Sequence, residues 1–144
     1  MKKTAVAYYS KTGSTGKVAC AMAQALGCFA YEIKDYPADQ NIDLLFIGGA
    51  IYGGQIDPAL VTFIETLDPK KVGQAAVFAT YASVHAQTEG KAEALIQSAL
   101  EKRGIPSVSE TFKCKGRFLF LNGKHPDEAS LQNARMFAAA LAGI

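Results

Sequence analysis

The sequence predicts an α/β fold, a three-layer α/β/α sandwich in which helices cover both faces of a five-stranded parallel sheet. Short apolar runs alternate along the chain with segments whose apolar residues recur every three or four positions, as in helices. The run IDLLFIGG at 42–49 is apolar almost throughout, as expected for a parallel strand buried on both faces. With 144 residues the chain has the size of one domain, and we expect a single domain over residues 1–144.

The first half of the chain begins with a strand, a helix and a second strand. KTAVAYY at 3–9 is a short apolar run that ends at a turn. The stretch 15–26 carries apolar residues at helical spacing, and Gly27 after it is typical of a helix C-terminal cap. CFAYEI at 28–33 alternates as a strand does. We expect these elements to precede the buried strand at 42–49.

The second half continues the alternation. Pro58 opens a helix with one apolar face, and Pro69 ends it. AAVFAT at 75–80 is the next buried strand, and the stretch 88–103 has a continuous apolar stripe that predicts a helix.

The last quarter is less regular. VSETF at 108–112 alternates weakly and RFLFL at 117–121 is apolar, so the pattern fits either two strands or one strand and a covering loop. A final helix is expected from Pro126 to residue 141.

Composition excludes several classes of protein. A hydrophobic content of 49% with 19% charged residues is typical of a globular domain. The formal net charge of +2 is too small, and the basic residues too dispersed, to indicate nucleic acid or an acidic membrane surface as a partner. No apolar stretch reaches the roughly 18 residues that span a bilayer, and the apolar run after the basic start is too short for a signal peptide. We expect a cytoplasmic monomer.

The cysteines indicate the same compartment. Cys20, Cys28 and Cys114 are odd in number and have no short paired spacing, which argues against a disulfide framework and against a metal cluster. Free cysteines of this kind suit a reducing environment.

The turn SKTGST at 10–15 follows the first strand and enters the first helix. It is not a triphosphate loop, because the entry glycine is missing and Val18, not a hydroxyl residue, follows Gly16-Lys17. The three spaced glycines of a dinucleotide-binding turn are also absent. Hydroxyls, backbone N–H groups and a helix N-terminus together suit a phosphate monoester. The alternative is a helix cap rich in Ser and Thr that binds nothing.

Two further loops should lie beside this turn, since ligands of parallel sheets bind beyond the carboxyl ends of the strands. The loop at 50–57 holds Tyr52 and two glycines, which suit a flat ring approached closely by backbone. The loop at 80–87 offers Tyr81 and His85. The alternative for each is a tight turn with an aromatic residue at its rim.

With these loops the chain resembles the flavodoxin family in its short form. SKTGST at 10–15 matches the family's phosphate loop, and IYGG at 51–54 matches its aromatic-Gly loop after the third strand. The segment 112–138 resembles the tail of a bacterial flavodoxin-like subgroup, and the resemblance extends over the whole chain in length and element order. It implies the strand order 2-1-3-4-5.

The resemblance also implies FMN as the cofactor, held by three groups of residues. Tyr52 stacks on the isoalloxazine, and Gly53 supplies the peptide that turns to bond the reduced ring nitrogen. His125 is expected to be structural. The residues implied are Ser10, Lys11, Thr12, Gly13, Ser14 and Thr15 at the phosphate, Ala50, Ile51, Tyr52, Gly53 and Gly54 at the ring face, and Thr80, Tyr81, Ala82 and His85 at the pyrimidine end.

The function implied is an electron carrier that shuttles single electrons between redox partner proteins. A flavin supplies the redox chemistry itself, and the three loops show no nucleophile with a matching base, so no catalytic residue is predicted. Two alternatives stay open: a small FMN-dependent NAD(P)H quinone or flavin reductase, and a flavin-free binding module on the same scaffold.

Overall fold

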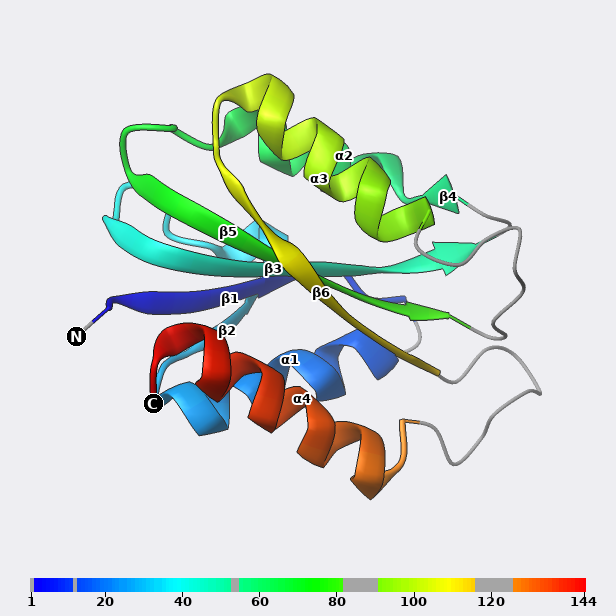
Figure 1. Ribbon diagram of the computed structural model, residues 1–144. Helices are drawn as coiled ribbons and strands as arrows, with labels where there is room; N and C mark the ends of the chain where they lie inside the picture. The colour runs from blue at the N-terminus through cyan, green and yellow to red at the C-terminus, as the bar shows by residue number, and fades with distance from the viewer. Residues whose placement is uncertain (1, 12, 53–54, 82–90, 116–125) are drawn as a thin grey trace.

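Five parallel strands form the central sheet of the computed structural model, and helices lie on both of its faces (Figure 1). The structure describes residues 2–11, 13–52, 55–81, 91–115 and 126–144. The parallel strands are β1 (Thr4–Tyr8), β2 (Ala30–Glu32), β3 (Ile42–Tyr52), β5 (Val72–Tyr81) and β6 (Ser107–Lys115). A two-residue strand, β4 (Gln55–Ile56), pairs antiparallel with the end of β3.

The strand order is β2-β1-β3-β5-β6, which confirms the predicted order once β4 is set aside. The chain leaves β1 for β2 on one side and then returns past β1 to form β3 on the other. This reversal of direction opens a crevice beyond the carboxyl ends of β1 and β3. The longest parallel ladder joins β3 to β5, from the pair Ile42 and Val72 to the pair Ala50 and Thr80.

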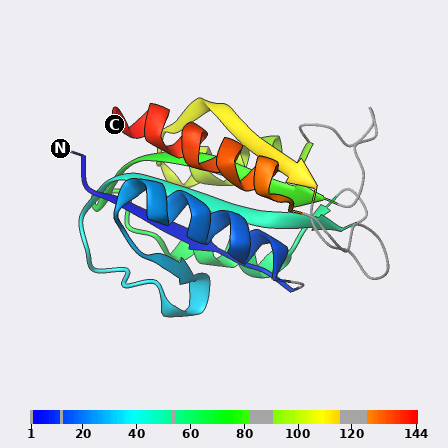
Figure 2. The same cartoon turned by 90° about the horizontal axis from the view of Figure 1, so that it is seen from below.

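Two pairs of helices cover the sheet. The helices α1 (Ser14–Leu26) and α4 (Glu128–Ala142) lie on one face, and α2 (Pro58–Thr66) and α3 (Lys91–Arg103) lie on the other (Figure 1). Seen from below, α1 and α4 run side by side (Figure 2). None of the helices in the described ranges is long and apolar enough to cross a membrane.

Side chains of the central strands alternate between the two cores, as a period of two requires. Phe46 and Phe78 pack toward α1 and α4. Their neighbours Ile47 and Val77 pack toward α2 and α3. Both sets are fully buried, which explains the unbroken apolar runs of β3 and β5 in the sequence.

The element boundaries differ from the predicted ones where caps decide them. The second strand begins at Ala30, not Cys28, because Cys28 N–H still bonds the Ala23 carbonyl and closes the end of α1. The last helix begins after Asp127 rather than at Pro126, because the Asp127 side chain caps it. A short 3₁₀ turn, η1 (Ile33–Asp35), and β4 were not predicted. The apolar run 117–121 lies outside the described residues.

Candidate functional site at the carboxyl ends of β1, β3 and β5

The turn after β1 is tightened by a hydrogen bond across it. Gly13 N–H donates to Ser10 Oγ over 3.0 Å. Gly13 has φ 88°, a left-handed conformation that favours glycine. Any other residue would be strained at this position, although a Cβ there would meet no atom within 4 Å. The glycine of SKTGST is therefore required by the backbone of the turn.

Helix α1 starts without a cap. Gly13 is its N-cap residue and offers no side-chain hydrogen bond, and the first turn has no acidic residue. Ser14 and Thr15 open the helix and are buried. The N–H groups of a first helical turn carry a partial positive charge and need acceptors. This helix end is suited to an anion.

Close packing beneath the turn depends on Gly16. A Cβ on Gly16 would lie only 3.2 Å from the Tyr8 ring, so the glycine lets α1 settle against the end of β1. Burial raises the pKa of the Tyr8 phenol, and neighbouring acidic groups add to the rise. Tyr8 was not predicted as part of the site. Gly16, two residues into the helix, was the available signal for a close contact.

A buried pair of hydroxyls joins α1 to β5. Thr15 Oγ1 and Thr80 Oγ1 lie 2.8 Å apart, and the two residues are 1% and 2% exposed. Two hydroxyls carry two protons, and only one proton lies between them. Within the described part of the chain, neither hydroxyl has a second hydrogen-bond partner. One buried O–H therefore lacks an acceptor there, which fits a ligand that accepts hydrogen bonds.

The second predicted loop follows an extension of β3. The pairs Ile51 with Ile56 and Tyr52 with Gln55 form a hairpin whose connection is Gly53-Gly54. At the base of this extension, a Cβ on Gly49 would lie 2.8 Å from Leu60. A larger residue there would require the Leu60 side chain of α2 to shift. The hairpin places the Tyr52 backbone beyond the carboxyl edge of the parallel sheet.

Asp57 ties the second loop to the first. Its Oδ1 accepts a hydrogen bond from Ala59 N–H over 2.9 Å and so caps α2. Its Oδ2 lies 3.3 Å from Lys11 Nζ. Asp57 was missed by the sequence analysis, although an Asp directly before Pro58 is a common helix start. Lys11 was predicted as a phosphate contact, and in this structure its ammonium group meets Asp57.

The described site residues gather at one edge of the sheet. Tyr9 N–H bonds the Gly48 carbonyl over 3.1 Å, and Ala50 lies in register with Thr80, so the three loops leave from adjacent positions. Tyr81 packs with Ala79 on the face of α2 and α3, opposite to Thr80. The predicted residues Thr12, Gly53, Gly54, Ala82 and His85 lie outside the described residues, as does His125.

A surface hollow lies beside the first turn. It has a volume of about 490 Å³, and its lining includes Ser10, Gly13, Gly16 and Lys17. Arg135 of α4 also reaches its wall. The lining also includes Glu32, so the hollow beside α1 carries both signs of charge.

The chain was compared with known families and structures. The family model of the flavodoxin domain matches residues 5–116. A search of curated proteins found no significant match. An archaeal flavodoxin aligns over 98% of this chain and 96% of its own, with 16% identity and a TM-score of 0.80. The oxidised flavodoxin 2 of Bacillus cereus covers 98% of both chains with 21% identity and a TM-score of 0.74.

A third structure includes a ligand. The flavodoxin of Fusobacterium nucleatum bound to flavin mononucleotide covers 99% of this chain and 98% of its own, with 11% identity and a TM-score of 0.70. At these identities the structures support the fold, and the domain match supports the family. The fold, the turn at Gly13 and the match over residues 5–116 agree, and the chain belongs to the flavodoxin family, whose members transfer electrons with FMN.

Proposed function

We propose that this chain is an electron carrier that binds FMN at the carboxyl ends of β1, β3 and β5. The observation that carries the proposal is the N-terminus of α1, which has neither a side-chain cap nor an acidic residue in its first turn. A phosphate dianion would satisfy the N–H groups of this turn and gain from the helix dipole. Ser10, Ser14 and Thr15 supply hydroxyls around the same point.

The ring of the cofactor is assigned to the other two loops. Tyr52, the last residue of β3, would cover one face of the isoalloxazine, and Tyr81 would meet its pyrimidine edge. The flavin supplies one-electron chemistry when bound. The chain's own contribution is to hold the phosphate, orient the ring and shield it from water.

The electrons must pass to and from other proteins, so redox partner proteins, a reductase and an acceptor, complete the proposal. We place the protein in the cytoplasm as a monomer, in line with its free thiols and weak net charge. The FMN-bound flavodoxin of Fusobacterium nucleatum supports the cofactor assignment through its shared fold.

Flavin titration of the apoprotein tests the proposal. Binding of FMN should quench flavin fluorescence at one equivalent, and riboflavin, which lacks the phosphate, should bind at least about tenfold more weakly because the α1 contacts are lost. Equal affinity for the two flavins would contradict the phosphate assignment. Absence of any flavin binding would favour a flavin-free binding module, and rapid bleaching of the bound flavin by NADPH alone would favour a reductase.

A further inference from the structure

The hydroxyl pair of Thr15 and Thr80 has a direction that the protein alone leaves undecided. Either oxygen can be the donor across the 2.8 Å contact. If Thr15 donates, the remaining proton belongs to Thr80, at the end of β5. If Thr80 donates, the remaining proton belongs to Thr15, in the first turn of α1.

The position of the two residues distinguishes the two directions once an anion is present. Thr15 lies in the turn whose N–H groups attract negative charge, and its hydroxyl can then donate to an oxygen of that anion. A hydroxyl that donates its only proton to the anion must accept from its other partner. Thr80 is the partner, and it is held there by its place on β5 between Ala50 of β3 and Cys114 of β6.

We propose, resting on the assignment of FMN to this site, that Thr80 donates to Thr15 and Thr15 donates to the FMN phosphate. Thr80 is then a positioning residue for the phosphate, although it comes from the loop expected to meet the opposite end of the cofactor. Its side chain points toward α1 and is 2% exposed. The pair thereby connects the phosphate turn to the strand that carries the ring-binding loop.

Because Thr15 and Thr80 are buried, the loss of one hydrogen bond in this series should weaken ligand binding measurably. A buried O–H without an acceptor is destabilising, and a donor to a charged oxygen contributes more than one between neutral groups. Removal of the Thr80 hydroxyl leaves Thr15 with an unmatched lone pair and free to rotate. The loss should appear in phosphate binding and be absent from ring binding.

The test compares FMN, riboflavin and inorganic phosphate on four variants. Thr80→Val keeps the shape of the side chain and removes its hydroxyl, and we expect it to weaken FMN and inorganic phosphate binding about tenfold while riboflavin affinity stays within about twofold. Thr80→Ser should restore FMN affinity to within about threefold of the wild type. In a Thr15→Val background, Thr80→Val should cause no further loss of FMN affinity, because the hydrogen bond from Thr15 to the phosphate is already absent.

The outcomes separate this inference from the proposed function. Equal losses of FMN and riboflavin affinity in Thr80→Val would mean that Thr80 contacts the ring, and the inference would be wrong while the FMN assignment stood. An unchanged FMN affinity in Thr80→Val would also overturn it. A wild-type protein that binds neither flavin would overturn both. Riboflavin binding by each variant serves as the control for folding.

Discussion

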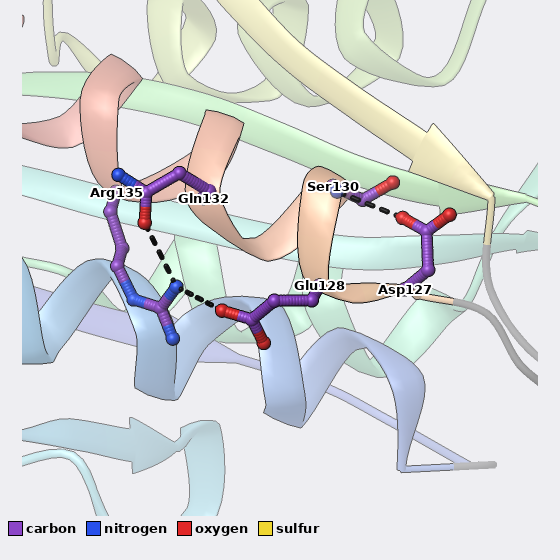
Figure 3. Close-up of polar contacts among 5 residues, drawn as sticks. All are labelled: Asp127, Glu128, Ser130, Gln132 and Arg135. Atoms are coloured by element: carbon purple, nitrogen blue, oxygen red, sulfur yellow. Dashed lines mark hydrogen bonds and ion pairs between the residues drawn. The ribbon is translucent and has the colours of Figure 1, made fainter.

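The N-termini of α1 and α4 lie on the same face of the sheet and are built in opposite ways. At α4, Asp127 Oδ1 accepts a hydrogen bond from Ser130 N–H over 2.9 Å (Figure 3). Glu128 places a second acidic group in the first turn and pairs with Arg135 Nη1 at 2.9 Å. At α1, Gly13 provides no cap and the first turn holds no acid. One helix end is capped by its own side chain, and the other has no side-chain cap, as the proposed phosphate site requires.

Both helix ends need acceptors for their first N–H groups, and the acceptor can serve either stability or ligand binding. A capped helix end contributes about 1 kcal/mol to folding. An uncapped end gives up that stability and gains affinity for an anion. The α1 end also carries the left-handed Gly13 and the close contact of Gly16 with Tyr8, both of which hold the amides in place without a capping side chain.

An acidic residue placed at the start of α1 should have the largest effect on FMN binding. Gly13→Asp places a carboxylate where the phosphate is expected, and we predict that FMN binds at least about 100-fold more weakly than to Gly13→Asn. Asp and Asn have nearly the same shape and should be strained alike by the left-handed φ, so the pair isolates the charge. Flavin titration of both variants measures the ratio.

Riboflavin provides the control for this substitution. Its affinity should differ between Gly13→Asp and Gly13→Asn by less than about threefold, because riboflavin brings no phosphate to the carboxylate. If the two variants bound FMN equally well, α1 would not be the phosphate end of the site.

The reverse change at α4 should affect only stability. Asp127→Ala removes the cap, and we expect the free energy of unfolding to fall by about 1 kcal/mol, with FMN affinity unchanged. Asp127→Asn keeps a capping oxygen and should lose less. Urea denaturation of the two variants measures the difference. A loss of FMN affinity in Asp127→Ala would mean that α4 also serves the site.

These contrasts also mark how far sequence reasoning reaches. The succession of strands and helices and the three loops follow from local patterns, because buried strands and glycine turns leave a signature within a few residues, whereas the strand order was expected from the family resemblance. The Thr15 to Thr80 contact joins residues 65 positions apart. The bond between Lys11 and Asp57 likewise joins separate loops. Contacts of this kind depend on tertiary packing, and no local periodicity encodes them.

The helix ends were harder to predict than the helices. Pro126 was expected to open the last helix, since proline is common at the first helical position. Asp127 has the stronger effect, because its carboxylate bonds the Ser130 N–H and so fixes the first turn after it. The missed β4 follows a different rule: two residues pair with β3 only because the hairpin brings them back.

The buried thiol of Cys114 packs in the core that α4 covers, and it gives a test of how stability depends on pH. Burial, and secondarily the charge of Asp127, raise the pKa of Cys114 from 9.0 to about 12. The thiol therefore ionises at lower pH in the unfolded state than in the folded state. The stability that the protonated Cys114 thiol contributes is complete below pH 9 and is lost as pH rises from about 9 to about 12. We expect a loss of about 0.8 kcal/mol between pH 7 and pH 9.5.

Cys114→Ala is the matched control for this dependence. The difference between the wild-type and Cys114→Ala unfolding free energies should narrow as pH rises, because the variant has no thiol to ionise at this position. A difference that stayed constant from pH 7 to pH 9.5 would show that the Cys114 thiol ionises alike in both states.

The smallest predicted effect on FMN binding concerns Lys11, the basic residue of the turn before α1. Lys11 is 56% exposed and its ammonium group lies 3.3 Å from Asp57, so much of its field at the phosphate is offset by that carboxylate. Lys11→Gln should therefore weaken FMN binding by no more than about threefold at physiological salt. Asp57→Asn keeps an oxygen that can cap α2 and removes the opposing charge, so it should strengthen FMN binding by about the same factor.

Both effects should shrink in 1 M salt, where the Debye length is about 3 Å. A large loss in Lys11→Gln would assign the lysine directly to the phosphate, and α1 would then hold its anion by a side-chain charge as well as by its amides.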